Sequence, residues 1–111
     1  MTSTPRRREA VLEHKYLLTS LKINGRHCDM TAGILSTRRN LIGHRSWDVV
    51  VRLALVDPRI VGPNMAVVMT TASDGVFSGR VSLASIQETD ADVSLRMEFR
   101  GTGPLTSPQA W

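Results

Sequence analysis

The chain has 111 residues, of which 41% are hydrophobic and 22% are charged, and its formal net charge at pH 7 is +4. This is the size and composition of one globular domain that buries its own core, and no apolar run is long enough to span a membrane as a helix. The single cysteine, Cys28, excludes an internal disulfide, and the basic start followed by Glu9 and Glu13 is unlike a secretory signal. We therefore expect a soluble protein without a membrane partner that stays inside the cell in which it is made.

The N-terminal residues are polar and include three consecutive arginines, which account for most of the net charge of +4. We expect residues 1–8 to form a flexible basic arm. Two interpretations of the next segment remain open. It forms either a short helix over about residues 5–15, with Pro5 in its first turn, or an extended chain that leads into a first strand at about residues 16–23.

The dipeptide Asn24-Gly25 is typical of a tight hairpin turn, and residues 26–31 are predicted to be the returning strand. The next segment, residues 32–45, contains two glycines, an asparagine and three arginines. This composition predicts an exposed loop. A loop of that length is unusual in a compact domain, and such loops are commonly functional or ordered by a partner.

From Trp47 onward, apolar residues alternate with other residues up to Leu55, as expected of a strand with one buried face. Turn sequences separate three further apolar runs, at residues 65–71, 76–86 and 93–100. The two clearest strands supply the predicted core residues, which are Trp47, Val49, Val51, Leu53, Val93, Leu95, Met97 and Phe99.

Six strands at regular spacing predict an all-β fold, a small antiparallel β-sandwich or barrel. Val67 and Val68 are adjacent in one of these strands, so both of its faces are expected to be covered, by a second sheet or by another subunit. The single β-domain is predicted to cover residues 9–106, and residues 107–111 form a C-terminal tail.

No group of residues forms a recognisable catalytic or metal-binding pattern. His27-Cys28-Asp29 places three reactive side chains next to one another, but adjacent residues of a strand point to opposite faces and do not converge. The histidines and the cysteine lack the spacing of paired metal ligands, and no glycine-rich phosphate loop leads into a helix. We therefore predict a protein without enzymatic activity, bound metal or cofactor.

Four short motifs follow one another along the chain, and together they resemble the phage major tail tube proteins over about residues 16–106. The motifs are Ile23–Thr31 (INGRHCDMT), Gly43–Trp47 (GHRSW), Phe77–Val81 (FSGRV) and Gly101–Leu105 (GTGPL). The resemblance implies a β-sandwich or barrel subunit that assembles into rings, commonly hexameric. The rings stack into the tube through which the genome passes.

On the basis of this resemblance we expect a structural protein of the phage tail that is assembled in the host cytoplasm. Its partners are expected to be further copies of itself and other phage tail proteins, with double-stranded DNA only as passing cargo. The predicted subunit interface comprises the basic arm, the 32–45 loop and the terminal aromatic residue, that is Arg6, Arg7, Arg8, Arg38, Arg39, Arg45 and Trp111.

Two alternatives remain open. The first is another phage structural part of similar fold, such as a tail terminator, connector, baseplate or head-decoration protein. The second is a small β-barrel that binds nucleic acid or a nucleotide through Arg38, Arg39 and Arg45. No aromatic residue that could stack on unpaired bases lies beside these arginines in the sequence, which argues against binding of single strands.

Overall fold

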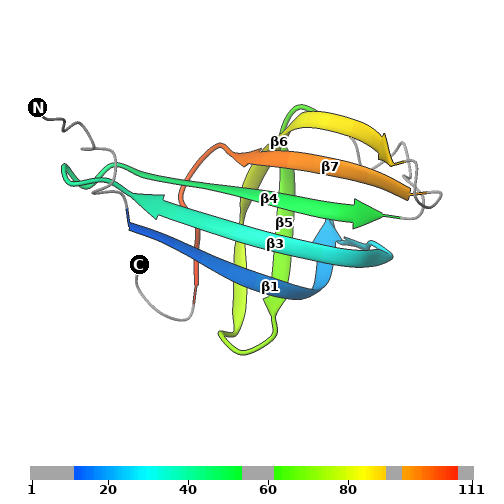
Figure 1. Ribbon diagram of the computed structural model, residues 1–111, viewed down its shortest axis with the longest axis horizontal. Helices are drawn as coiled ribbons and strands as arrows, with labels where there is room; N and C mark the ends of the chain where they lie inside the picture. Colours follow the sequence, from blue (N-terminus) through cyan, green and yellow to red (C-terminus); the bar gives the residue numbers. More distant parts are fainter. Residues whose placement is uncertain (1–11, 54–61, 90–93, 108–111) are drawn as a thin grey trace, which may run out of the picture.

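The computed structural model describes residues 12–53, 62–89 and 94–107, and every regular element within them is a β-strand (Figure 1). The prediction of an all-β fold is therefore confirmed. The strands are β1 (Leu12–Ile23), β2 (Arg26–His27), β3 (Met30–Arg39), β4 (Arg45–Leu53), β5 (Met65–Thr71), β6 (Val76–Thr89) and β7 (Ser94–Gly101). The described residues form no helix long and apolar enough to cross a membrane.

Six of the strands close into an antiparallel barrel in the order β1–β3–β4–β7–β6–β5, and β5 returns to pair with β1. β1 closes the barrel because it changes partner along its length. Leu12–Leu17 pair with β3, whereas pairing with β5 begins at Leu18 and continues to Ile23, with a register shift between Leu18 and Ser20. The two-residue strand β2 pairs with the end of β1 and is not part of the closed barrel.

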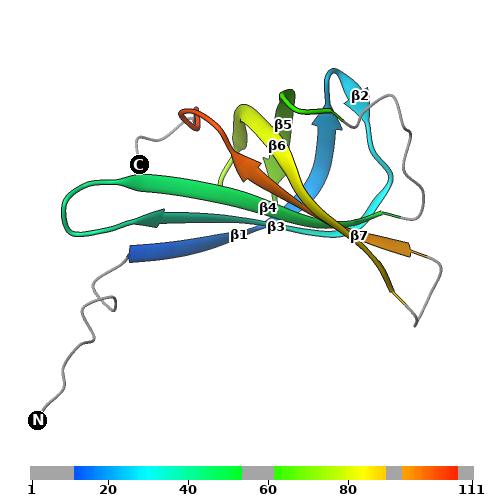
Figure 2. The ribbon, with the colours of Figure 1, turned by 90° about the horizontal axis from the view of Figure 1, so that it is seen from above.

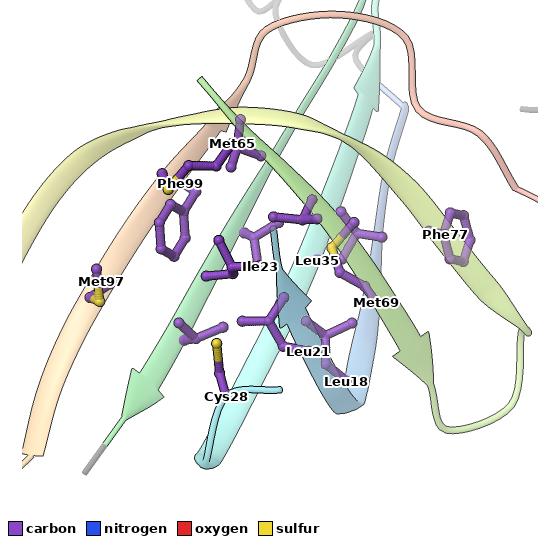
Figure 3. Packing of buried hydrophobic residues seen from close by; sticks show 14 of the residues in the cluster. Leu18, Leu21, Ile23, Cys28, Leu35, Met65, Met69, Phe77, Met97 and Phe99 are labelled. Atoms are coloured by element: carbon purple, nitrogen blue, oxygen red, sulfur yellow. The ribbon is translucent and has the colours of Figure 1, made fainter. Parts of the chain in front are cut away.

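The barrel interior is filled by alternate residues of its strands (Figure 3). Six predicted core residues lie there, each at most 3% exposed: Trp47, Val49, Val51, Leu53, Met97 and Phe99. Leu95 is half-buried, and Val93 lies outside the described residues. The remaining strands contribute further fully buried side chains, among them Leu21, Ile23, Leu35, Met65 and Met69.

The turn predicted at Asn24-Gly25 is confirmed. Asn24 has a φ of 52° and Gly25 a φ of 81°, the left-handed conformations that a two-residue hairpin turn needs at both central positions. The returning strand is shorter than predicted, because β2 ends at His27 and a new strand begins at Met30.

The predicted loop at residues 32–45 is wrong for most of its length. Residues 32–39 belong to β3, and only residues 40–44 separate this strand from β4. Gly33 indicates a loop in the sequence, but in the structure it makes room for packing. A Cβ at this position would lie 2.6 Å from the sulfur of Met30 and 3.2 Å from Val51 Cγ1.

The short helix considered for residues 5–15 is excluded at residues 12–15, which belong to β1 and pair with β3. The basic arm, residues 1–8, lies outside the described residues. At the other end of the chain, Thr106 forms a β-bridge with Ser78 of β6, so the chain remains attached to the barrel up to the predicted end of the domain.

Strands β1, β3 and β4 continue beyond the barrel as a three-stranded sheet (Figures 1 and 2). The pairing registers define its limits, because β5 pairs with β1 only from Leu18 and β7 pairs with β4 only from Asp48. We call residues 12–17, 34–39 and 45–47 the extension, whose base includes the buried core residues Leu35 and Trp47, and we call residues 40–44 its tip. Figure 2 shows the hairpin of β3 and β4 projecting from the barrel in this direction.

Candidate functional site

The tip of the extension is a tight turn held by the side chain of Asn40. Its Oδ1 accepts hydrogen bonds from the backbone N–H of Ile42 at 3.1 Å and of His44 at 2.9 Å. The backbone N–H of Gly43 donates to the Asn40 carbonyl at 3.0 Å, and Gly43 has a φ of +85° that favours glycine. The tip is therefore fixed by its own hydrogen bonds.

This turn presents two large aliphatic side chains to solvent. Leu41 is 82% exposed and Ile42 is 87% exposed. Single exposed apolar residues are common on protein surfaces, but two consecutive ones at the end of a projecting hairpin form a local apolar surface that water covers in the isolated chain.

The two faces of the extension differ in charge. On the outer face, Arg38 Nη1 donates to Asp48 Oδ2 at 2.8 Å, and Arg38 Nε lies 3.2 Å from Glu13 Oε2. The hydrogen bond to Asp48 is the main cause that raises the pKa of Arg38, and the charges of Asp48 and Glu13 act in the same direction against partial desolvation. The guanidinium group of Arg38 thus forms ion pairs with two carboxylates of the same chain.

The inner face of the extension is the one that carries the buried side chain of Trp47. On this face, Arg39 and Arg45 are direct cross-strand partners. Leu12 pairs with Arg39 from the other side, so one row across the extension contains an aliphatic residue and two arginines. Both arginines therefore lie at the end of the extension, next to the tip.

A cavity of about 460 Å³ lies against the inner face. It is lined by Leu12, His14, Tyr16, Thr37, Arg38, Arg39 and Arg45. In the described part of the chain, none of its lining residues is an aspartate or a glutamate. The cavity thus combines cationic groups with the apolar surface of Leu12 and Tyr16.

A second and larger cavity, of about 810 Å³, lies between the base of the tip and the C-terminal segment. Its lining comprises residues 44–47 and 100–107, so Arg45 borders both cavities. The described residues that line it likewise contain no carboxylate side chain.

Trp47 closes this end of the barrel. Its indole Nε1 donates to the carbonyl oxygen of Gly103 at 2.9 Å, and its ring covers two glycines on neighbouring strands. A Cβ at Gly79 would lie 2.6 Å from Trp47 Cζ2, and a Cβ at Gly101 would overlap three atoms of the indole. Three of the four sequence motifs thus meet at one point.

All three residues of the predicted arginine cluster line the cavity of about 460 Å³, but they lie on two faces of the sheet. Arg39 and Arg45 are cross-strand partners on the inner face, whereas Arg38 forms ion pairs on the outer face. The other predicted interface residues, Arg6, Arg7, Arg8 and Trp111, lie outside the described residues.

Sequence reasoning missed Leu41 and Ile42 as an exposed apolar tip, and it missed His14 and Tyr16 as neighbours of the arginines. Asn40 and Gly43, three residues apart, are a turn signal that could have identified the tip. The alternation of Leu12, His14 and Tyr16 could have placed these three residues on one face of a strand.

The residues of the His27-Cys28-Asp29 segment point in different directions, since Cys28 is buried and its two neighbours are exposed. Over the ranges that the structure describes, no three histidine, cysteine, aspartate or glutamate residues gather closely enough to hold a metal ion.

Comparison with protein-family models, curated proteins and solved structures gives no match to this chain. The function must therefore be inferred from the chemistry of the extension and its two cavities.

Proposed function

We propose that this chain is a structural virion protein, a phage tail tube-like subunit that self-assembles into stacked rings around the channel for genome passage. The observation that carries the proposal is the extension, which ends in an exposed aliphatic pair. In a monomer this surface remains in water, whereas a neighbouring subunit in a ring or stack can cover it.

The tip can supply a substantial part of the association energy. Full burial of a leucine or isoleucine side chain contributes about 1.5–3 kcal/mol, so Leu41 and Ile42 together would contribute about 3–6 kcal/mol at each contact. Because Asn40 already fixes the turn, little conformational entropy is lost when the tip is buried.

The strand edges of the extension offer a second means of contact. Among the described residues, Leu12–Tyr16 of β1 pair with β3 on one side only, and Arg45–Trp47 of β4 likewise pair only with β3. An unpaired strand edge can accept a strand from another chain. A neighbouring subunit could therefore continue the sheet at either edge.

Outward-facing apolar residues extend this adhesive surface onto the barrel. Leu17 and Ile34 are cross-strand partners and are 66% and 38% exposed. On β5, Val67 is buried but Val68 is 41% exposed, so the described part of the chain covers only one face of this strand. Coverage of the second face by another subunit would agree with the proposal.

Three of the motifs on which the resemblance to tail tube proteins is based contribute to one packing unit. The motifs around Trp47, Gly79 and Gly101 are far apart in the sequence, yet their residues pack together. A tail terminator, connector, baseplate or head-decoration subunit would share these features and would differ in its copy number and position in the particle.

Light scattering coupled to size-exclusion chromatography, together with electron microscopy, tests the proposal. We expect rings or tubes for the wild-type chain at high concentration. The Leu41→Ser/Ile42→Ser variant should fold but assemble at concentrations at least about a hundredfold higher, because about 3–6 kcal/mol corresponds to more than two powers of ten in affinity.

Ile86→Ser is the matched control, since Ile86 is an exposed aliphatic residue near the C-terminal end of β6 and lies outside the extension. It should leave assembly unchanged. A strictly monomeric wild-type chain would refute the proposal, and equal loss of assembly in both variants would remove the tip as its basis.

A further inference from the structure

We propose that the free edge of β1 in the extension is a two-fold interface, at which residues 12–16 pair antiparallel with the same residues of a second copy. The two-fold axis passes through residue 14, and the two extensions join into one continuous sheet. This contact names the partner of the β1 edge. It needs only two copies and does not depend on the rings or the channel of the proposed function.

The edge lies on the part of β1 that projects from the barrel (Figure 2), and no described strand pairs with it over residues 12–16. Its backbone groups are oriented for pairing. The carbonyl oxygen of Leu17 points away from β3, since it accepts the backbone N–H of Ala72 at 3.0 Å. Hydrogen-bonding groups of successive residues point to alternate edges of a strand, so those of Lys15 and Glu13 point the same way as those of Leu17. Each Glu13 can therefore exchange both of its backbone hydrogen bonds with Lys15 of the other copy.

The charged side chains of this edge are self-complementary about His14. When His14 lies opposite its own copy, Glu13 lies opposite Lys15 of the second copy, and both are on the outer face. Opposite charges on directly opposite residues stabilise a strand pair, and like charges destabilise it. A shift of the register by two residues would place Glu13 opposite Glu13 or Lys15 opposite Lys15, and a shift by one would turn the side chains to the wrong faces. The charges therefore select one register.

The ion pair between Glu13 and Arg38 is compatible with this contact. Arg38 belongs to β3, on the other side of Glu13, and its Nε lies 3.2 Å from Glu13 Oε2. A carboxylate has about four acceptor positions on its two oxygens, so Glu13 can accept from Arg38 and from a lysine of the second copy together. Lys15 is exposed and forms no ion pair with a described residue, so the dimer supplies its partner.

The inner face supports the same register. Leu12, which is 54% exposed, lies opposite Tyr16 of the second copy. An aliphatic and an aromatic residue in these positions stabilise a strand pair, and the contact removes apolar surface of Leu12 from water. Charge on the outer face and apolar contact on the inner face thus favour one arrangement.

Analytical ultracentrifugation of the full-length Leu41→Ser/Ile42→Ser variant tests the interface without a contribution from the tip. The measurement is made at pH 8, where histidine side chains are uncharged and do not repel across the axis. We expect dimers. Lys15→Glu or Glu13→Lys, added singly, places like charges opposite each other and should raise the dissociation constant at least about tenfold. An equimolar mixture of these two variants should return to within about threefold of the starting affinity, because every pair then joins opposite charges.

Lys22→Glu is the matched control, because Lys22 is an exposed lysine of the same strand that pairs with β2 on one side and with β5 on the other. It should dimerise as the starting variant does. Circular dichroism checks that Glu13→Lys, which also loses the ion pair with Arg38, remains folded. Recovery in the mixture is a second check, since an unfolded partner would not restore the dimer.

Cysteine cross-linking tests the register in the otherwise wild-type chain. Residue 14 meets its own copy in a non-hydrogen-bonded pair, in which Cα atoms are about 4.5 Å apart, within the range of a disulfide. His14→Cys should therefore form a covalent dimer with oxidised glutathione. Leu12→Cys should not, because the two copies of residue 12 are about 14 Å apart along the strands. The native Cys28 is buried and is common to both variants.

Charge variants that dimerise as tightly as the control, a mixture that remains monomeric, or equal cross-linking of His14→Cys and Leu12→Cys would each overturn the proposal. The proposed function fails in a different way. Dimers without rings or tubes would refute the tube and leave this interface intact. Rings that form equally well from the Lys15→Glu variant, without dimers at low concentration, would refute the interface alone.

Discussion

The Gly101→Ala substitution tests whether the packing of the Trp47 ring against glycine backbone stabilises this end of the barrel. The added methyl group would overlap Cε2, Nε1 and Cδ2 of the indole. The ring cannot simply move aside, because it also lies against Gly79 and donates a hydrogen bond to Gly103 at 2.9 Å. Overpacking in a core costs about 1–3 kcal/mol, and loss of the hydrogen bond adds about 1 kcal/mol. We expect the free energy of unfolding to fall by about 3 kcal/mol.

A double-mutant cycle separates this steric effect from a general weakness of alanine at position 101. Trp47→Ala alone should cost about 3–5 kcal/mol, as is usual for a buried tryptophan. Once the indole is gone, the alanine at position 101 no longer meets the ring and should cost less than about 1 kcal/mol. The two substitutions should therefore be coupled by about 2 kcal/mol.

Gly103→Ala is the internal control, because a Cβ there would have no atom within 4 Å and the residue does not have a positive φ. The carbonyl of residue 103 still accepts the indole N–H in this variant. Its stability should change by no more than about 0.5 kcal/mol. Urea unfolding followed by far-ultraviolet circular dichroism suits all four variants, since it does not depend on tryptophan fluorescence. Equal effects of Gly101→Ala and Gly103→Ala, or additive energies in the cycle, would refute this account of Trp47.

Two further predictions concern the outer face and the first turn. Arg38→Gln should lower the free energy of unfolding by only about 0.5 kcal/mol, and by less in high salt, because the side chains of its ion pairs with Glu13 and Asp48 are about a third or more exposed. Since the pKa of Arg38 is raised, its contribution is complete below the unfolded-state pKa of arginine and is lost only at strongly alkaline pH; a fall in stability caused by Arg38 in the neutral range would contradict this. Asn24→Ala should cost about 2 kcal/mol in thermal or urea unfolding, because alanine disfavours a φ of 52° and the 3.0 Å bond from Ala66 N–H to Asn24 Oδ1 is lost. Asn24→Gly, which tolerates that φ, should cost about half as much.

Local patterns in the sequence were enough to predict the strands of the barrel that lie on the core. The run at residues 65–71 coincides with β5, and the alternation from Trp47 to Leu53 matches the buried residues of β4. These predictions succeed because burial of one strand face produces a period of two that is visible in the residues themselves.

β3 could not be predicted in the same way, because the alternation of apolar and other residues is interrupted near both of its ends. Gly33 lacks a side chain for reasons of packing, and the strand ends in two arginines that extend past the core. The closure of β1 on β5 is also invisible to local patterns, since nothing in either strand specifies a partner about fifty residues away.

The candidate site was only half predictable for a related reason. Arg38, Arg39 and Arg45 are close in the sequence, but neighbouring residues of a strand face opposite sides. Once residues 38 and 39 are known to lie in a strand, their separation follows directly. Leu41 and Ile42 have the composition of core residues, and only the turn made by Asn40 reveals that they are exposed.

The arrangement of the barrel strands has a consequence for how the chain reaches its native state. Strands β1, β3 and β4 form one half-barrel and β5, β6 and β7 the other, and the described strands of the two halves pair along β1–β5 and β4–β7. These two junctions join distant residues, such as Leu18 with Thr71 and Asp48 with Arg100, so they form more slowly than the hairpins within each half. Until they form, each half has two open edges that fit the half of any other copy. The protein concentration during refolding should therefore determine the ratio of closed monomers to dimers that have exchanged half-barrels.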